Sequence, residues 1–431
     1  MAHPSDDAPS DSLMALVGSL ADPLAPTAAP VVDGARRAAA LDPTAGLARP
    51  AAARPAPGDW RDRMAEVRDR YSASPTFQRW AARIPGVRWI ARRRARQVVD
   101  LVAGFAYTQT VAACLRLDLL ALVRDEPLAE AAIAARLAVP LEGLQRLSNA
   151  AAALGLLERR SGNRWGLGFL GAPLLADAGL ARMIEHNALL YEELRDPLAL
   201  LRRPTAHGAN RGTALSDYWP YVDADRRASL DSADVSDYST LMTATVAPVA
   251  AELLDAVSLD GARRLLDVGG GEGGFVRAAA TRHPRLALSL FDLPPVAERA
   301  TRALGAAGLG GRVAVHGGDF TRDALPTGAD VITLVRICLD HDDATVRALL
   351  ARVREALPRG GRVIIAEPFA GARGTEVVGD VYFGYYLWAM GRGRARRADE
   401  LRALLTDAGF RRVRVRPTRY QVQAGVMEGV A

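Results

Sequence analysis

The chain has 431 residues, more than one ordinary domain of about 100–200 residues usually takes. With 49% hydrophobic and 24% charged residues it is predicted to be globular and able to bury a sizeable core. The formal net charge is +6, but all 55 basic residues are arginines, which indicates genomic codon bias, so we do not take the charge as a sign of nucleic-acid binding. The two cysteines, Cys114 and Cys338, lie in apolar contexts and favour buried thiols in a reducing, cytoplasmic compartment.

The N-terminal region begins with a segment of low complexity. Residues 1 to about 58 are rich in Ala, Pro and Asp without sustained periodicity, which predicts a disordered tail. The chain shows neither a signal peptide nor an 18-residue apolar span, so we expect a protein that does not cross a membrane.

Residues 60–97 are strongly basic. Eleven arginines face three acidic residues, and aromatic residues such as Trp60, Trp80 and Trp89 are interleaved among them. Basic segments that carry aromatics suit an anionic membrane surface or nucleic acid. A solvated helical arm that packs on a partner subunit is the alternative and the favoured interpretation, and peripheral contact with the inner or intracytoplasmic membrane stays open.

Residues 101–175 show the order of a winged-helix domain. An apolar helix, Val102 to Leu122, precedes two further helices, and LLERRSGNRWGL then forms two extended runs around a Ser-Gly-Asn turn. Arg146 and the hairpin arginines would suit DNA reading. The second of the two further helices is mostly Ala and Leu, however, with few side chains able to reach base edges, so dimerisation is the favoured role.

From Arg264 onward, strand and helix patterns alternate. The expected strands are RRLLDVG, LALSLFDL, RVAVHGGDF, ADVITLVRICL and GRVIIAEPF. This alternation predicts an α/β domain with a parallel, doubly wound sheet, whose ligands bind beyond the carboxyl ends of the strands. Residues 176–260 are predicted to be mainly helical, with a loop near residues 204–212.

A glycine-rich loop, LLDVGGGEGGF at residues 265–275, lies directly between a strand and a helix. A G-x-G-x-x-G pattern begins at Gly269 and formally matches the dinucleotide fingerprint. Asp267 and Glu272 would repel a pyrophosphate, whereas the same acids suit the ammonium and sulfonium groups of S-adenosylmethionine. S-adenosylmethionine is therefore favoured over NAD.

Two further strand ends carry acids that suit the same cofactor. Asp292 closes the second strand and would take the ribose hydroxyls. In the turn Gly317-Gly318-Asp319-Phe320, the acid can accept a hydrogen bond from the adenine amino group while the ring stacks on the base. Each residue alone is an ordinary turn or cap residue, but three correctly ordered strand ends favour a cofactor site.

With these motifs the chain resembles the plant-type class I O-methyltransferases. LLDVGGGEG, FDLP, GGDF, LVRICLDHDD and VIIAEPF recur in that family in this order, and the likeness covers residues from about 60 to 425. SPTFQRWAARIP, IARRRARQVVDLVAGFAYTQ and EHNALLYEELRDPLALLR resemble the bacterial members that methylate acyclic carotenoids, of the demethylspheroidene (hydroxyneurosporene) type.

The resemblance implies a homodimer with an N-terminal winged-helix dimerisation domain and a C-terminal Rossmann-like domain. We therefore expect the basic arm and dimerisation domain over residues 59–180, a helical linker and substrate-pocket segment over 181–260, and the methyltransferase domain over 261–431. The implied reaction is methylation of the C-1 tertiary hydroxyl of an acyclic carotenoid in spheroidene and spirilloxanthin biosynthesis. An enzyme for an aromatic polyketide, a phenol or bacteriochlorophyll, and a winged-helix regulator that senses S-adenosylmethionine, are the alternatives.

The resemblance also implies particular cofactor contacts. Arg336 stands where the family often places a large or basic residue beside the adenine. Tyr238 and Met242 fall where the family covers the methionine end of the cofactor. The other implied contacts are Gly269, Gly271, Asp292, Leu293, Asp319 and Phe320.

The turn in VITLVRICLDHDDATV departs from the family pattern at the catalytic position. Many members carry His-Asp-Trp there, with the His as general base; Leu339 aligns with that His, Asp340 matches, and His341 takes the Trp position. Glu367 aligns with one of two acids that support the base, and the other, near Ala395, is missing. Late proton transfer to His341 or Asp340 is one hypothesis, and packing of His341 beside the pocket is the other.

Asp342 and Asp343 precede a helical pattern, so capping explains them better than a metal ion, because adjacent residues seldom converge on one ion. No metal is expected.

An acceptor pocket is predicted from two aromatic segments. His186, in EHNALLY, is a second candidate base on a helix expected to cover this pocket. DVYFGYYLWAMGRG offers an apolar wall for a long polyene through Tyr382, Tyr386 and Trp388, with ordinary core as the alternative.

Overall fold

The computed structural model describes residues 60–203, 212–219, 236–419 and 424–431. Contacts divide the chain into two units, residues 1–98 and 99–431. The predicted disordered tail and nearly all of the predicted loop at 204–212 lie outside the described residues.

In the first unit, the basic residues lie on helices. Helices α3 (Trp60–Ser72) and α4 (Pro75–Ala81) precede the start of α5 (Val87–Arg116). Three indole rings are more than half exposed: Trp60, Trp80 and Trp89. This arm therefore presents aromatic side chains to its surroundings together with its arginines.

Helix α5 contradicts one expectation. Among the described residues it is a helix long and apolar enough to cross a membrane, by length and composition alone. The sequence was expected to hold no 18-residue apolar span, but an 18-residue window of this helix is apolar enough on average even though the helix also contains charged residues. Leu101 and Phe105 of this helix are 84% and 73% exposed, so its apolar face is uncovered in a single chain.

The predicted winged-helix order is confirmed in the second unit. After α5 come α6 (Leu119–Leu122), α7 (Glu130–Leu137) and α8 (Leu141–Ala153). Strands β2 (Leu157–Arg160) and β3 (Arg164–Leu167) form the hairpin, and β1 (Leu128–Ala129) pairs with the other side of β3. The single helix expected from Val102 to Leu122 is broken before α6, where Asp118 adopts a left-handed backbone. The core of the winged-helix domain is formed by buried side chains that include Leu119, Ile133, Leu144 and Trp165.

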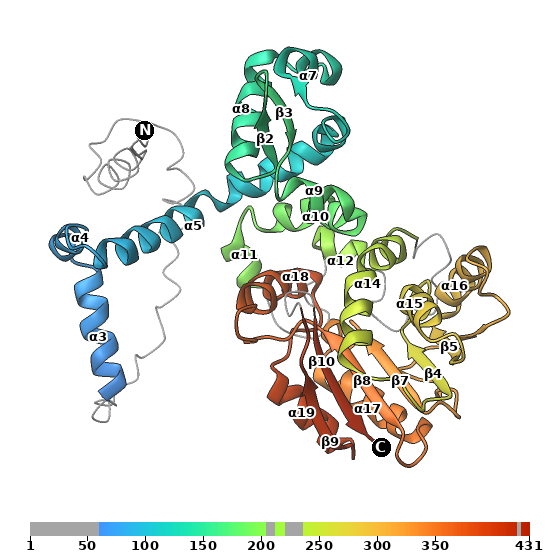
Figure 1. Ribbon diagram of the computed structural model, residues 1–431. Coiled ribbons are helices and arrows are strands. Elements are labelled where there is room, and N and C mark those ends of the chain that lie inside the picture. The colour runs from blue at the N-terminus through green and yellow to red at the C-terminus, as the bar shows by residue number, and fades with distance from the viewer. Residues whose placement is uncertain (1–59, 204–211, 220–235, 420–423) are drawn as a thin grey trace, which may run out of the picture. The chain divides into compact units, whose positions relative to one another are not determined.

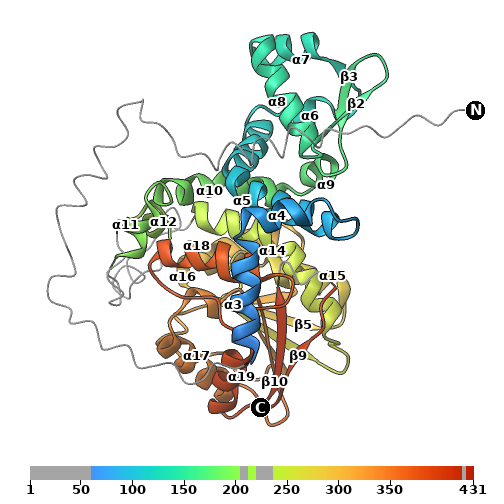
Figure 2. The ribbon, with the colours of Figure 1, turned by 90° about the vertical axis from the view of Figure 1, so that its left-hand side faces the viewer.

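Helices connect this domain to the large sheet. They are α9 (Gly171–Ala176), α10 (Ala178–Glu193), α11 (Pro197–Leu201), α12 (Ala214–Tyr218) and α14 (Ser236–Ala256). Figures 1 and 2 both show α9 and α10 between the winged-helix elements and the large sheet. The helical prediction for residues 176–260 is therefore confirmed wherever the structure describes them.

The large sheet has seven strands in the order β6-β5-β4-β7-β8-β10-β9 (Figure 1). The strands are β4 (Arg264–Val268), β5 (Ala287–Asp292), β6 (Val313–Gly317), β7 (Val331–Val335), β8 (Arg362–Glu367), β9 (Arg411–Arg416) and β10 (Gly425–Val430). All five predicted strands are present. The sheet is mixed rather than wholly parallel, because β10 runs antiparallel to both β8 and β9.

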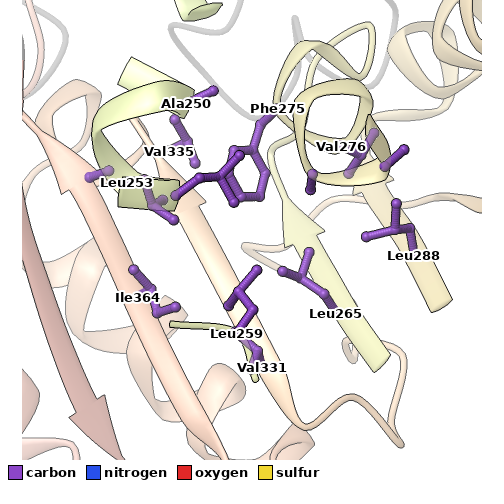
Figure 3. Close-up of a cluster of buried hydrophobic side chains, with 14 of the residues drawn as sticks. Ala250, Leu253, Leu259, Leu265, Phe275, Val276, Leu288, Val331, Val335 and Ile364 are labelled. Atoms are coloured by element: carbon purple, nitrogen blue, oxygen red, sulfur yellow. The ribbon is translucent and has the colours of Figure 1, made fainter. Parts of the chain in front are cut away.

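Helices cover both faces of this sheet. They are α15 (Gly274–Arg282), α16 (Pro294–Ala306), α17 (Asp343–Ala356) and α19 (Ala398–Asp407), while a π-helix, η2 (Val377–Tyr382), leads into α18 (Phe383–Met390). Figure 3 shows Leu253 of α14 and Phe275 of α15 pointing toward the strands that carry Leu265 and Ile364. The next residue of β4, Leu266, packs with α17 and α19 on the opposite face, as the two-residue period of a strand requires.

The strand order reverses between β4 and β7, which are neighbours although two strands separate them in the chain. The crossovers on the two sides of this point lead away from each other, so a crevice opens at the carboxyl ends of these strands.

Candidate active site

A cavity lies at this reversal point. It is lined by residues that follow β4, β5, β6 and β7 and by side chains of α14. Nearly all of the predicted cofactor residues line it: Tyr238, Met242, Asp267, Gly269, Gly271, Asp292, Leu293, Asp319, Phe320 and Arg336. Asp340 and His341, the two candidate bases of the catalytic turn, line the same cavity. Residues from five separate segments of the chain therefore meet at one place.

The glycine loop after β4 forms the floor of the cavity. Gly269 has φ +71°, and a Cβ there would collide with the side chain of Ile337. Gly271 has φ +57° with open space around it, and its N–H donates to Asp292 Oδ2 at 2.8 Å. Only glycine adopts these backbone angles without strain, so the loop leaves room for a ligand to approach the main chain.

Asp267, at the end of β4, is a buried acid that faces the cavity. Its Oδ1 accepts from Thr333 Oγ1 at 2.7 Å, while no donor of the described residues reaches Oδ2. Burial, and then the charge of Asp292, raise the pKa of Asp267 to about 7 despite the bond from Thr333. A buried carboxylate oxygen without a donor is costly, so this position suits a cationic ligand group.

Asp292 and the turn after β6 lie farther along the same edge. Asp292 Oδ1 accepts from the Leu293 N–H at 2.7 Å, and burial raises the pKa of Asp292 to about 6. Asp319 Oδ1 accepts from the N–H and the hydroxyl of Thr321. Gly318, which belongs to the turn predicted to bind the adenine and was itself expected to contact the cofactor, does not line the cavity; a Cβ at Gly318 would meet the ring of Phe291, so close packing explains this glycine.

Glu272 corrects another expectation. Its carboxylate pairs with Arg299 of α16 at 2.5 Å and does not line the cavity. Of the two acids in the glycine loop that were expected to face the cationic end of a cofactor, only Asp267 lines the cavity. Sequence proximity to the loop could not reveal this, because the partner of Glu272 comes from another helix.

Arg336 follows β7 and reaches toward α14. It is one of five non-glycine residues with positive φ among the described residues, at +56°. Its guanidinium donates to Thr245 Oγ1 at 2.9 Å and contacts Met242 Sδ at 2.6 Å. Arg336 therefore joins the turn after β7 to the helix that also carries Tyr238.

The turn after Arg336 carries Asp340, whose side chain opens onto the cavity. Asp340 Oδ2 accepts from the Tyr238 hydroxyl at 3.4 Å. Burial raises the pKa of Asp340 to about 7, against the opposing effects of Arg336 and Tyr238. A carboxyl group with this pKa can accept a proton near neutral pH.

The imidazole of His341 is held between aromatic rings. Phe320 meets it edge-on with 5.3 Å between ring centroids, and Trp219 lies 6.1 Å away. His341 is 7% exposed. It therefore packs beside Phe320, the residue expected to stack on the adenine.

Leu339 and Glu367 lie away from the cavity. Leu339 packs in an apolar cluster with Tyr386 and Leu387. Glu367 Oε2 accepts from the Leu339 N–H at 3.1 Å, and burial raises the pKa of Glu367 to about 7 against the effect of Arg396. Glu367 thus contacts the backbone of the catalytic turn, not the cavity into which a ligand would bind.

The capping interpretation is confirmed for Asp342, whereas Asp343 is the first residue inside α17 and its side chain binds arginines instead. Asp342 caps α17 by accepting from the Thr345 N–H at 2.8 Å and also bonds Arg392. Burial alone would raise the pKa of Asp342, but these partners outweigh it and bring the value to about 2. Asp343 pairs with Arg394 and Arg396. Within the described residues, no group of three potential ligands could hold a metal ion.

The predicted acceptor-pocket residues form an aromatic cluster that packs around Leu339. His186 Nε2 lies 2.9 Å from the Tyr386 hydroxyl, and burial lowers the pKa of His186 to about 4. Tyr382 stacks on Tyr386 and donates to Asn187 Oδ1 at 2.9 Å. Trp388 donates its indole N–H to the Leu200 carbonyl. None of these four predicted residues lines the cavity described above.

Sequence reasoning missed two aromatic residues of the site. Trp219 lines the cavity, and Tyr218 packs on His186 with 4.7 Å between centroids. Both come from the short segment DYW at the end of α12, which has too few residues to show a periodic pattern.

The amino-acid sequence was compared with models of protein families and with known proteins, and both comparisons point to the same family. Residues 99–177 match the O-methyltransferase dimerisation domain, and residues 212–411 match the O-methyltransferase domain. Demethylspheroidene O-methyltransferase of Cereibacter sphaeroides is 44% identical over 348 residues, which cover 81% of this chain and 90% of that protein. The chain belongs to the O-methyltransferase family.

Further similarities support this family assignment. Demethylspheroidene O-methyltransferase of Rhodobacter capsulatus is 38% identical over 331 residues, covering 77% of this chain and 81% of that protein. The solved structure of CalO1, a methyltransferase of calicheamicin biosynthesis in its SAH-bound form, has a TM-score of 0.65 and 26% identity, and covers 78% of this chain and 98% of that one.

This O-methyltransferase uses S-adenosylmethionine, as predicted. The residues at the cavity fit the cofactor: Asp267 offers an unsatisfied buried oxygen to a cation, Asp292 a second buried carboxylate, and Gly271 an open approach to the backbone. When bound, S-adenosylmethionine supplies a methyl group on a positively charged sulfonium.

The dimerisation role predicted for the winged-helix region is also confirmed. The arginines that would have suited DNA reading have local partners: Arg146 pairs with Glu142, Arg159 lies over the ring of Trp165, and Arg164 donates to the Ser161 carbonyl.

We predict that Asp267→Asn weakens S-adenosylmethionine binding roughly 10- to 100-fold, because the cationic end of the cofactor loses its buried counter-charge. The same change should stabilise the cofactor-free protein at pH 8 by about 2–4 kcal/mol. Folding raises the pKa of Asp267, so its stability contribution is complete below about pH 4 and is lost as pH rises through about 7. Isothermal titration calorimetry and denaturant unfolding at pH 5 and pH 8 measure both effects.

Glu272→Gln is the matched control, because it removes an acid of the same loop that pairs with Arg299 outside the cavity. It should keep cofactor affinity within about threefold. Equal losses of affinity in the two variants would contradict the assignment of Asp267.

Proposed function

We propose that this O-methyltransferase methylates a hydroxyl group of an acyclic carotenoid, demethylspheroidene or a close analogue. The observation that carries the choice of acceptor is the match to two demethylspheroidene O-methyltransferases, at 44% and 38% identity over most of their length. We also assign the aromatic cluster of His186, Tyr218, Tyr382 and Tyr386 to the acceptor side of the site: it packs around Leu339, beside Asp340, and its apolar rings suit a polyene.

The chemistry of such an acceptor accounts for the altered catalytic turn. A tertiary alcohol is far less acidic than a phenol, so the oxygen attacks the methyl group while it still carries its proton. Correct alignment of the oxygen, the methyl group and the sulfur can lower the activation free energy by on the order of 7–11 kcal/mol. The proton must then leave to a nearby base. A histidine poised to deprotonate a phenol beforehand is not required, and Leu339 occupies its place.

We assign the proton acceptor to Asp340. Its carboxyl opens onto the cavity and contacts the Tyr238 hydroxyl, and its pKa of about 7 matches the task. His341, packed between Phe320 and Trp219, forms a wall of the cavity on this proposal. His186 orients Tyr386 in the acceptor wall, and its lowered pKa keeps it neutral.

Asp340→Asn should lower kcat roughly 100- to 10,000-fold and leave the Kd for S-adenosylmethionine within about threefold. In the parent enzyme kcat/KM should rise with pH through about 7, because only the ionised carboxylate accepts a proton, and in the variant this rise should disappear. Initial rates between pH 5.5 and 9 measure both. His341→Ala tells the two candidate bases apart: if it abolishes the pH dependence and Asp340→Asn keeps it, the histidine is the base.

The acceptor is tested by incubating the purified protein with labelled S-adenosylmethionine and a panel of hydroxylated carotenoids, phenols and chlorins, with products identified by mass spectrometry. We expect a methylated carotenoid. The second candidate is an aromatic hydroxyl, which the 30% identity to 3-hydroxy-5-methyl-1-naphthoate 3-O-methyltransferase of Streptomyces sahachiroi favours. Methylation of phenols or naphthoates alone would replace the carotenoid proposal with this one.

The uncovered face of α5 suits a second copy of the chain. Leu101 and Phe105 lie within the matched dimerisation domain, which begins at residue 99, and are largely exposed in one chain. We therefore assign this face to the homodimer interface and not to a membrane span. The boundaries at residues 58, 180 and 260 stay predictions.

The arm before this interface, residues 60–97, suits the surface of a membrane that holds the carotenoid. Arginines and the exposed indoles of Trp60, Trp80 and Trp89 combine charge attraction with interfacial anchoring. The full-length protein should bind vesicles that contain phosphatidylglycerol, less so at high salt, and bind pure phosphatidylcholine vesicles weakly. R92E/R93E/R94E should lower vesicle affinity at least about 10-fold in co-sedimentation.

R285E/R359E/R402E is the control, because it reverses as many exposed arginines in the methyltransferase domain. Equal binding by both triple variants would show that overall charge, and not the arm, accounts for the attraction.

A further inference from the structure

Arg396 is a fully buried arginine, with 0% of its side chain exposed, in the segment between α18 and α19. Burying a guanidinium costs several kcal/mol unless its donors are satisfied, so its partners indicate why it is there. The cavity at the strand ends does not include it, so it does not contact a bound cofactor there.

Each nitrogen of this guanidinium meets an acceptor on the catalytic turn. Nη1 donates to the Cys338 carbonyl at 2.5 Å and Nη2 to the His341 carbonyl at 2.7 Å. Nε donates to Asp343 Oδ1 at 2.9 Å. The two carbonyls flank Leu339 and Asp340, so the arginine spans the residues that present the proposed proton acceptor.

Two further groups bond the backbone of the same turn at Leu339. Glu367 at the end of β8 accepts from the Leu339 N–H, and the Arg394 N–H donates to the Leu339 carbonyl at 2.8 Å. Gly393 has φ +79°, and a Cβ there would collide with the backbone of Leu339 and Asp340. The segment that carries Arg396 therefore lies directly against the turn.

We propose that Arg396 is a positioning residue for methyl transfer, which holds the turn from Cys338 to Asp343 so that Asp340 faces the cavity. The inference rests on the proposed role of Asp340. A planar fork with several fixed donors can bind two carbonyls and a carboxylate at once, whereas lysine, a point charge on a flexible stem, cannot hold the three in one geometry. A displacement of about 1 Å at a reacting group can cost about 100-fold in rate.

Arg396→Lys tests this proposal with the acceptor that the parent enzyme methylates best in the panel. We expect kcat to fall roughly 10- to 100-fold while the Kd for S-adenosylmethionine stays within about threefold, because the cofactor carboxylates lie on other strands. The rise of kcat/KM near pH 7 should shift, because the surroundings of Asp340 change. In an Asp340→Asn background, Arg396→Lys should have little further effect, as expected of two residues that act through one step.

Arg394→Ala is the matched control: Arg394 also pairs with Asp343 but is 43% exposed, and its side chain does not bond a turn carbonyl. Its kcat should stay within about twofold. If Arg396→Lys fails to fold in thermal melting, Asp343→Asn weakens the same contact from the partly exposed side, and a several-fold loss of kcat that vanishes in the Asp340→Asn background supports the proposal.

Unchanged kcat in Arg396→Lys, or in Asp343→Asn where only that variant folds, would overturn the positioning role. So would an undiminished loss in the Asp340→Asn background. Normal turnover of Asp340→Asn by itself would instead overturn Asp340 as the proton acceptor, and a non-carotenoid product would overturn the acceptor, so the three failures are distinguishable.

Discussion

Three carboxyl groups, those of Asp267, Asp292 and Asp340, are buried around one cavity, and each accepts at least one hydrogen bond from the surrounding structure. Each has a raised pKa because burial disfavours its charge. A protein that only needed stability would replace such acids with apolar residues. On the proposed assignment, a cationic cofactor compensates this cost at Asp267, whereas the negative pyrophosphate of a dinucleotide would increase it, so this acid favours S-adenosylmethionine over a dinucleotide.

The catalytic turn shows how one family scaffold accommodates a different acceptor. Leu339 packs into the aromatic cluster, and Asp340 opens onto the cavity one residue later. Glu367 binds the turn from β8, and Arg396 binds it from the segment before α19. On this proposal, Glu367 and Arg396, which do not line the cavity, hold the turn so that Asp340 does.

The two uncovered surfaces of the N-terminal region differ in chemistry. The face of α5 around Leu101 and Phe105 is apolar and lies in the dimerisation domain, whereas the arm before it combines arginines with indoles. An apolar face without charges suits a protein partner, and a basic aromatic one suits an anionic interface.

By itself the sequence determined the five strands from β4 to β8 with the helices between them, the glycine loop and the acids at the strand ends, because each of these is a local pattern with a period or a turn chemistry of its own. It also indicated that Asp342 caps a helix, since a cap is decided within four residues. Only the tertiary structure decided that Glu272 pairs with Arg299, that β10 is antiparallel, and that His341 packs against Phe320. These depend on residues brought together from distant segments, and no local pattern records which partner a buried charge or ring will meet.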